Sequence, residues 1–274
     1  MTVTITSPNE TVLVDVRDAV CWISFNRPES LNAINPELVS ALDHIMTAVR
    51  DNNDIRCVVL QGEGNHFMAG GDIKKFKTML DTEPDMTARR HEFERLLHNV
   101  HDVIFKMRNL RQPIVAIVNG AVAGAGVSLM LACDLVIASD TAFFTLAYCH
   151  LGVSPDGGST YHLPRTVGMK RAFEIALLGD RFDAVTAEKW GLINWVFTAD
   201  QIQTESSKII SRIANGPTHA HAHAKSLLNT SLNNSIEAQL DAEITNFVDC
   251  TTTPDFIEGV TAFIEKRKPQ FNGR

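Results

Sequence analysis

The sequence contains no run of about 18 apolar residues, the length at which a helix becomes a candidate to cross a membrane. It also has no basic start followed by an apolar core, the pattern of a secretory signal peptide. Its five cysteines show no Cys-x-x-Cys spacing of the kind that holds metal ions or redox-active disulfides. We therefore expect a protein of the reducing cytoplasm that has no membrane as its partner.

Positive charge is also scarce. There are 25 Lys and Arg against 32 Asp and Glu, so the net charge is −7 and the pI is about 5.8. This balance argues against a nucleic acid or an anionic membrane surface as the main partner. The chain of 274 residues is 45% hydrophobic, which is enough to bury a substantial core. Short apolar strands alternate with helices to about residue 195, after which the pattern is helical to the end.

Two apolar runs each lead into a glycine-rich turn. Ile114 to Val118 is a β-branched run typical of a buried strand, and the segment Asn119 to Asp134 follows it. Cys57 to Gly62 is a second such run, and Asn65 to Lys74 follows it with two adjacent glycines. Glycines let another molecule approach the backbone, and a helix beginning near Gly124 would present free N–H groups to an anion. The pattern indicates a site for negative charge, although glycines that only allow close helix–strand packing would look the same.

Helical spacing marks further elements. Pro36 to Arg50 has apolar residues at helical intervals, with Asn35 placed as the N-cap and Pro36 as the first helical residue. The stretch from Thr87 to Leu110 predicts a second helix, and Pro84-Asp85 marks the loop before it. Gly216-Pro217 separates two helices of the C-terminal part.

Taken together, the glycine-rich segments resemble those of the crotonase (enoyl-CoA hydratase/isomerase) superfamily. Other matching segments are Ile23 to Pro28, Leu31 to Ala33, Leu151 to Gly158, Leu163 to Arg165, Ala187 to Ile193 and Phe263 to Pro269. The resemblance implies an α/β fold, a crotonase-like spiral of repeated ββα units, with a C-terminal helical region that forms trimers. It assigns acyl-CoA binding and catalysis to residues 1–195, and oligomerisation as a homotrimer or homohexamer to residues 196–274.

The resemblance also implies a substrate and an anion site. Members of the superfamily bind acyl-CoA thioesters and stabilise negative charge on the thioester oxygen with two backbone N–H groups. Residue-by-residue matching places these donors at the amides of Gly71 and Ala125. Removing one such donor typically costs about 3–4 kcal/mol in the transition state. Coenzyme A enters as part of the substrate, so no separate cofactor is expected.

The acid/base positions differ from those of the best-known members. Hydratases of the family use two glutamates, and the matching positions here hold Ser128 and Tyr148. Neither side chain replaces a carboxylate as a general base at neutral pH. Asp156 resembles the aspartate of single-acid isomerases, which would remove a proton beside the thioester carbonyl and return it two carbons away. Aspartate before glycine is also a common turn residue, so a purely structural role stays open.

His101 leaves other mechanisms open. Its spacing from Pro113 and Asn119 resembles that of the histidine base in aryl-CoA dehalogenases, whose aspartate nucleophile matches Asp156. Those enzymes carry tryptophan where Tyr148 stands and lack the Pro-Asp-Gly-Gly context, so hydrolysis ranks second to isomerisation. A histidine on an amphipathic helix is also commonly a partly buried polar residue. A hydratase with atypical acid/base residues and a CoA-ester-binding subunit without turnover are further alternatives.

Groups for the CoA moiety follow from the resemblance. Positions near the CoA phosphates and adenine hold Arg27 and Lys74. A neighbouring subunit would add Phe263 and Lys266 at such positions. The main chain is expected to contact adenine at Ala69, Asp72 and Ile73. Lysine serves phosphate as a mobile point charge, and arginine serves it as a two-pronged donor. Each of these charges is almost equally typical of an ordinary solvated surface.

From the sequence alone, we expect two further motifs to carry no function. His219, His221 and His223 alternate with alanines, and a helix would place the first and last at metal-ligand spacing. No acidic or cysteine ligand lies near them along the chain, so we expect no metal site. The segment Gly120 to Gly126 is neither Gly-x-Gly-x-x-Gly nor a P-loop, so we expect neither NAD binding nor nucleotide hydrolysis.

Overall fold

The computed structural model describes residues 4–273 and contains a large and a small β-sheet. The large sheet has the strand order β1-β2-β3-β4-β6-β9. These strands are β1 (Val12–Arg17), β2 (Val20–Phe25), β3 (Cys57–Gly62), β4 (Ile114–Val118), β6 (Leu135–Ser139) and β9 (Trp195–Phe197). Only β1 and β2 pair antiparallel, and the other neighbours are parallel. Parallel sheets require cover on both faces, which the helices supply.

The small sheet is built from β5 (Ala121–Ala123), β7 (Phe143–Thr145) and β8 (Phe182–Asp183). Two isolated parallel bridges lie outside the named strands. One pairs Met68 with Val122 of β5, and the other pairs Ile34 with Gly71. The chain passes directly from β4 to β5 and from β6 to β7, and a helix follows each pair. This repeated step from the large sheet to the small sheet makes the ββα units that the resemblance implies.

Two helices cover one face of the large sheet. They are α1 (Pro36–Arg50) and α3 (Met86–Asn109), which pack against each other. The predicted cap of α1 is confirmed, because the Asn35 side chain accepts a hydrogen bond from the Leu38 amide at 2.9 Å. The second predicted helix is also confirmed, and Asp85 caps it through the Ala88 amide at 2.8 Å. Both predicted strands, now β3 and β4, have the expected bounds.

The core has two compartments, one on each face of the large sheet. In β3, Val58 and Leu60 join the compartment beneath α1 and α3, whereas Cys57 and Val59 join the other compartment. This alternation is the two-residue period of a strand. Helix α8 (Ile202–Ala214) covers the second compartment with residues that include Ile210. The remaining elements before α8 are α2 (Ile73–Thr82), α4 (Ala125–Leu131), α5 (Ser159–Val167), α6 (Met169–Leu178), α7 (Ala184–Lys189), and the 3₁₀ turns η1 (Pro28–Ser30) and η2 (Tyr148–Leu151).

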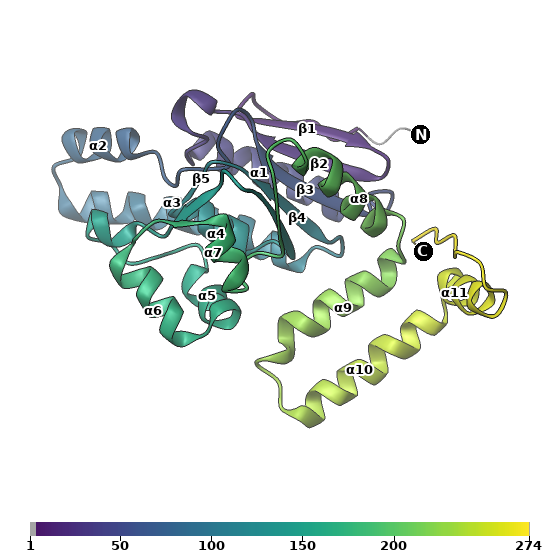
Figure 1. Cartoon of the computed structure of the whole chain (residues 1–274). Helices are drawn as coiled ribbons and strands as arrows, with labels where there is room; N and C mark the ends of the chain where they lie inside the picture. Colours follow the sequence, from purple (N-terminus) through teal and green to yellow (C-terminus); the bar gives the residue numbers. More distant parts are fainter. Residues whose placement is uncertain (1–3, 274) are drawn as a thin grey trace.

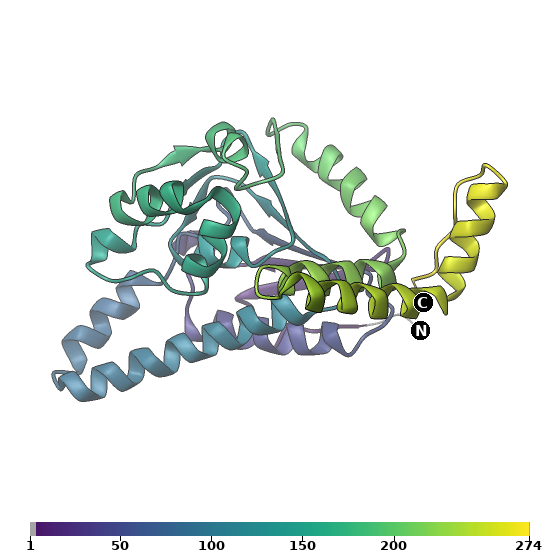
Figure 2. The ribbon, with the colours of Figure 1, turned by 90° about the horizontal axis from the view of Figure 1, so that it is seen from below.

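The last three helices form an arm that extends away from the sheets (Figures 1 and 2). The arm consists of α9 (Thr218–Ser231), α10 (Ile236–Thr251) and α11 (Pro254–Ile264). As predicted, Gly216-Pro217 separates α8 from α9. Lys225 joins α9 to the core, because its Nζ lies 2.7 Å from Asp134 Oδ2.

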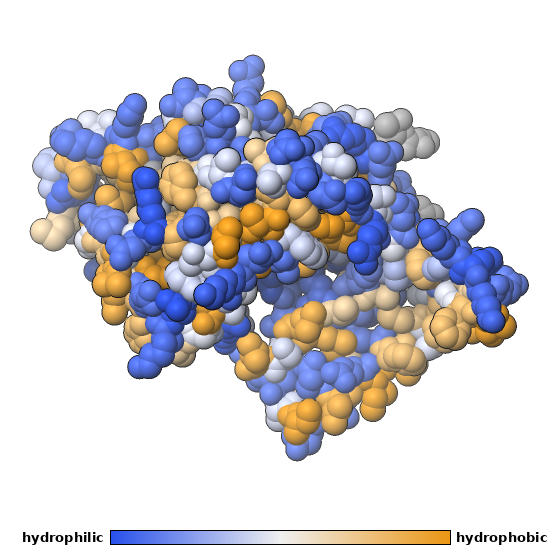
Figure 3. Space-filling model, in the orientation of Figure 1, coloured by the Kyte–Doolittle hydropathy of each residue, from blue (hydrophilic) through white to orange (hydrophobic). Residues whose placement is uncertain are grey.

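The arm exposes many apolar side chains to solvent (Figure 3). They include Leu228, Leu232, Leu240, Ile244, Phe247 and Phe263. Exposed apolar patches commonly mark contacts with another molecule. The trimer or hexamer, and the division of the chain at residue 195, stay predictions. Among residues 4–273, no helix combines the length and apolar composition that crossing a membrane requires.

Candidate active site

Three polar side chains from different elements form one hydrogen-bonded cluster. They are Ser128 on α4, Tyr148 at the start of η2 and Asp156 in the loop before α5. The Tyr148 hydroxyl donates a hydrogen bond to Asp156 Oδ1. Ser128 Oγ lies 3.4 Å from the Tyr148 hydroxyl and donates to the main-chain oxygen of Asp156 at 2.9 Å. The two positions that match hydratase glutamates therefore lie directly beside Asp156.

The backbone around Asp156 is held in a defined shape. Its carbonyl oxygen also accepts hydrogen bonds from the Ser159 hydroxyl at 2.9 Å and from the Ser159 amide at 3.2 Å. Gly157 follows with φ of +60°, and a Cβ atom there would lie 2.8 Å from Ser128 Cβ. The carboxylate itself is bonded by Tyr148, a side chain from η2, rather than by an amide of its own turn. This contact favours a role for Asp156 beyond turn formation.

Electrostatics give the members of the cluster different roles. Burial raises the pKa of Tyr148, and the nearby charge of Asp156 and their hydrogen bond raise it further. Tyr148 therefore stays protonated at neutral pH and acts as a donor. Ser128 is buried and hydrogen-bonded to the main chain of Asp156. Asp156 remains the group in the cluster with the chemistry of a general base.

The Gly71 amide faces away from the neighbouring Ile34 segment. The Ile34 amide donates to the Gly70 carbonyl at 2.7 Å, and the Asp72 amide donates to the Ile34 carbonyl at 2.9 Å. In such a parallel pairing, the residue between the two bonded ones directs its own N–H to the opposite side. The Gly71 N–H is thus left free of this ladder.

The loop that carries Gly71 lies against the start of α4. A Cβ atom on Gly70 would be 3.3 Å from the Ala123 carbonyl oxygen and 3.7 Å from the Ala125 nitrogen. Ala125 is the first residue of α4, so its N–H has no acceptor within the helix. The structure therefore brings the two predicted donors, Gly71 and Ala125, onto adjacent loops.

Close packing explains two glycines of this region. A Cβ atom on Gly126 would lie 2.3 Å from the Met68 carbonyl oxygen, so this glycine lets α4 approach the segment around Met68. A Cβ atom on Gly71 would lie 2.9 Å from the Phe76 ring, which covers this residue from α2. Close packing therefore accounts for Gly126 and Gly71, and the anion site stays a prediction.

The expected CoA contacts are only partly brought together. Arg27 Nη2 lies 2.9 Å from Asp72 Oδ2, and these side chains are only 14% and 11% exposed. Arg27 is therefore already paired inside the protein. Ala69 lies in the loop before α2 and donates its amide to the Leu31 carbonyl at 3.0 Å. Ile73 and Lys74 are exposed on the first turn of α2.

Phe263 and Lys266 do not join these residues within one chain. Phe263 is 85% exposed near the end of α11, and Lys266 follows that helix. In both ribbon views, α11 lies at the opposite end of the molecule from α2 (Figures 1 and 2). A contribution to the CoA site would have to come from a neighbouring subunit, which stays a prediction.

His162 packs beside the Asp156 loop, whereas no hydrogen bond or ion pair among the described residues places His101 there. His101 on α3 has a buried Nε2 without a hydrogen-bond partner among the described residues. His162 on α5 packs against Gly158, and burial, followed by the charges of Arg108 and Arg165, lowers its pKa to about 4. No hydrogen bond or ion pair within residues 4–273 joins His101 to Asp156. Sequence reasoning missed His162, because only the packing of α5 brings it here.

Comparison with known proteins decides the family. A family model described as enoyl-CoA hydratase/isomerase matches residues 15–274. The chain belongs to the enoyl-CoA hydratase/isomerase family. It is 34% identical to a 1,2-epoxyphenylacetyl-CoA isomerase of Escherichia coli, covering 97% of this chain and 99% of the relative. It is 36% identical to a probable enoyl-CoA hydratase of Rhodobacter capsulatus, covering 96% and 98% of the two chains.

Solved structures of the enoyl-CoA hydratase/isomerase family agree with the fold. A putative enoyl-CoA hydratase from Streptomyces coelicolor superposes with a TM-score of 0.90 at 30% identity, covering 100% of this chain and 98% of the other. An enoyl-CoA hydratase from Polaromonas gives a TM-score of 0.88 at 32% identity, covering 95% and 99%. The predicted crotonase-like α/β fold and the family resemblance are confirmed, and the protein is an enzyme of this family. The relatives' names include both hydratases and isomerases.

Proposed function

We propose that this enzyme moves the double bond of an enoyl-CoA thioester, with Asp156 as the proton shuttle. The observation that carries the proposal is the cluster around Asp156. The two positions that hold glutamates in hydratases hold Ser128 and Tyr148, and both side chains bond to Asp156. One carboxylate with two neutral neighbours suits a proton transfer between carbons better than the addition of water, which uses two carboxylates in the family.

The proposed reaction needs only a base and an anion site. Asp156 removes a proton from the carbon next to the thioester carbonyl, and the electrons form a dienolate. The amides of Gly71 and Ala125 stabilise the resulting charge on the thioester oxygen. Asp156 then returns the same proton two carbons away, so the double bond shifts into conjugation and nothing is consumed. Because Tyr148 bonds Oδ1, Oδ2 is the oxygen that carries the proton.

Coenzyme A enters this reaction as part of the substrate, and no further cofactor takes part in it. The isomerase named among the relatives acts on a CoA ester, which supports this substrate class. A relative from Streptococcus mutans, 27% identical over 263 residues, is named as an isomerase of an acyl-carrier-protein ester. An acyl-carrier-protein thioester is therefore the natural second substrate to assay.

A hydrolytic reaction is the second candidate. The buried, unpartnered Nε2 of His101 supports it, because a buried ring nitrogen usually has a partner. In this alternative, Asp156 attacks an aryl-CoA carbon that carries a halide, and the halide leaves. His101 would then activate the water that hydrolyses the ester on Asp156.

A panel of Δ3-enoyl-CoA thioesters of different chain length tests the proposal. We expect the purified enzyme to generate the absorbance of a conjugated 2-enoyl thioester without added metal or nucleotide. Binding of the same esters is measured separately by calorimetry. Esters that bind but are not converted would refute isomerisation and leave a CoA-ester-binding subunit. Formation of a 3-hydroxyacyl-CoA instead would indicate an atypical hydratase.

A further inference from the structure

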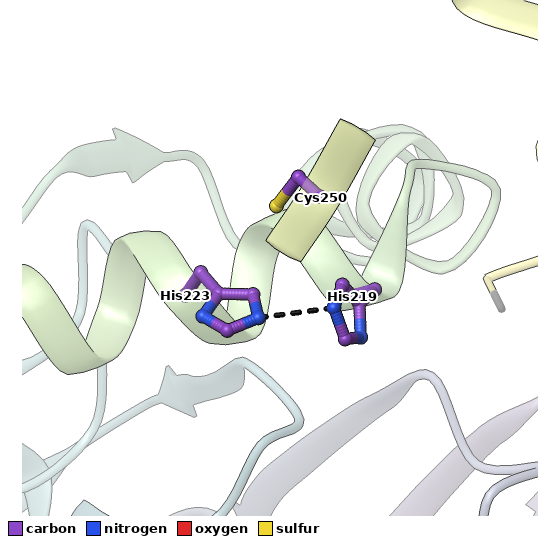
Figure 4. A group of neighbouring side chains, drawn as sticks. All are labelled: His219, His223 and Cys250. Atoms are coloured by element: carbon purple, nitrogen blue, oxygen red, sulfur yellow. Dashed lines mark hydrogen bonds between the residues drawn. The ribbon is translucent and has the colours of Figure 1, made fainter. Parts of the chain in front are cut away.

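The arm contains a cluster of histidine, aspartate and cysteine side chains on two neighbouring helices. His219 and His223 lie one turn apart on α9, and Asp249 and Cys250 lie in the last turn of α10. Asp249 Oδ2 lies 2.9 Å from His219 Nε2 and 2.8 Å from His223 Nε2. The two Nε2 atoms are 3.0 Å apart, and Cys250 Sγ lies within 4.8 Å of the histidine ligand atoms (Figure 4).

Hydrogen bonds of His223 place its Nε2 atom next to the other ligand atoms of the cluster. The amide oxygen of Asn246 can only accept, so the bonded Nδ1 of His223 carries a proton. A neutral His223 then has a lone pair on Nε2, and this lone pair lies 2.8 Å from the carboxylate oxygen of Asp249. Two acceptors at this distance repel each other. A metal ion bound to both atoms would bridge these two acceptors.

We infer that His219, His223, Asp249 and Cys250 bind one divalent transition-metal ion of the class represented by Zn²⁺. Imidazole nitrogen, carboxylate oxygen and thiolate sulfur are the donors that Zn²⁺ takes in proteins. Zn–N bonds of about 2.0–2.1 Å at tetrahedral angles place two ligand nitrogens about 3.3–3.4 Å apart. The observed 3.0 Å between the histidine nitrogens is close to this separation.

The surroundings of the cluster fit a metal site with one adjustment. Asn246 holds the Nδ1–H of His223, and such a partner commonly orients a metal-binding histidine. Arg111 Nη2 donates to His219 Nδ1 at 3.3 Å, which requires the proton of His219 on Nε2. Metal on Nε2 would move this proton to Nδ1, so Arg111 would turn away. Arg111 is exposed, and Asn53 Oδ1 at 3.4 Å offers it another partner.

An ion can reach the cluster from solvent. His219 and Cys250 line a cavity of about 500 Å³ whose other walls include Phe256 and Val260 of α11. The side chains of His219 and His223 are 23% and 25% exposed. A bound ion would clamp the end of α10 to the first turns of α9. From the sequence we expected no metal here, because only the fold brings Asp249 and Cys250 to these histidines.

Titration of the full chain, without a histidine tag and freed of metal by a chelator, tests the inference. We expect the protein to take one equivalent of Zn²⁺ from a chromogenic indicator and to unfold at a higher temperature when loaded. His223→Gln should abolish this binding, whereas His44→Gln, on the exposed surface of α1, should leave it unchanged. Asn246→Ala should weaken it about 10- to 100-fold, as loss of an orienting partner typically does.

Cobalt reports the ligands independently of stability. Co²⁺ bound at the site should give a tetrahedral visible spectrum with a sulfur charge-transfer band, and Cys250→Ser should remove that band. Circular dichroism of each variant shows whether its helices are intact. Absence of stoichiometric binding to the wild-type chain would overturn the inference. Undiminished binding by a folded His223→Gln variant would overturn it as well.

Discussion

The hydroxyl of Tyr148 donates a hydrogen bond to one carboxylate oxygen of Asp156. The two residues are eight positions apart in sequence and come from η2 and from the loop before α5. The contact orients the carboxylate through Oδ1, so in the proposed reaction Oδ2 is the oxygen that meets the substrate. Ser128 completes the arrangement by holding the main chain of Asp156.

Asp156→Asn should abolish isomerisation, because an amide cannot accept and return the proton. General acid–base catalysis typically contributes about 10²- to 10⁴-fold, so we expect kcat to fall within or beyond that range. Calorimetric affinity for the CoA ester should change little. Asp200→Asn, at an exposed turn, is the matched control. Full isomerase activity of the Asp156→Asn variant on Δ3-enoyl-CoA would exclude this aspartate as the proton shuttle.

Tyr148 should resist ionisation in the folded protein. Its pKa is raised by burial, by the charge of Asp156 and by their hydrogen bond. Above about pH 10 the unfolded chain loses this phenolic proton while the folded chain keeps it, so stability falls as pH rises. The phenolate absorbance of native wild type and native Tyr148→Phe should therefore coincide through the alkaline range. After denaturation, the wild type should show the absorbance of one more phenolate than Tyr148→Phe. The same difference in absorbance between the two native proteins would contradict the raised pKa of Tyr148.

His101→Gln separates the two candidate reactions. In an isomerase that uses Asp156 alone, the substitution should change kcat by well under about 10-fold, since no general base is lost. In a hydrolase, it should cause an ester on Asp156 to accumulate with a halogenated aryl-CoA. Peptide mass spectrometry detects that ester, and its appearance would select hydrolysis. His44→Gln again serves as the surface control.

Gly126→Ala should destabilise the enzyme, although alanine is normally favoured in a helix by about 0.5–1 kcal/mol. The new Cβ would lie 2.3 Å from the Met68 carbonyl oxygen. Overpacking of this kind typically costs about 1–3 kcal/mol, measurable as a lower denaturant midpoint. Gly259→Ala, in α11, is the matched control, because its nearest contact would be 3.4 Å from a flexible Phe271 ring. Equal effects at the two glycines would show that the contact with Met68 relaxes.

Lys225→Met should loosen the attachment of the arm. Lys225 Nζ pairs with Asp134 and also donates to the carbonyl oxygens of Met107 and Gln112, both at 3.2 Å. Methionine keeps the apolar stem but removes one partner of Asp134, which retains Arg108 at 3.6 Å, so we expect a loss below the ~3–5 kcal/mol typical of a broken buried pair but above about 1 kcal/mol. Lys208→Met, which removes an exposed pair with Glu205, should cost less than about 1 kcal/mol. Similar free energies of unfolding for both variants would contradict the proposed anchor.

Much of the local structure could be predicted from the sequence. The bounds of β3, β4 and α1 follow from apolar runs, helical spacing and the Asn35 cap, all of which act within a few residues. The glycine-rich turn before α4 could be predicted for the same reason. The roles of Gly71, Ala125 and Asp156 came from the family resemblance and remain predictions.

The contacts between distant segments could not be predicted. Nothing local indicates that Arg27 pairs with Asp72, which lies 45 positions away. Nor does the spacing of His219 and His223 indicate that Asp249 Oδ2 will lie within 2.9 Å of both their Nε2 atoms. His162 reaches the Asp156 loop only because α5 folds back against Gly158. Such contacts depend on how whole elements pack, and many packings share the same local pattern.

By itself, therefore, the sequence determined elements such as β3, β4, α1 and α3, because hydrophobic period and caps are encoded over short stretches, and its motifs gave the family by resemblance. Only the tertiary structure decided that Ser128 and Tyr148 donate hydrogen bonds to Asp156. It also decided that α10 brings a carboxylate and a thiol to the histidines of α9. The reason is physical: the energy of a polar contact depends on ångström distances between side chains. Those distances are set by the packing of the complete chain.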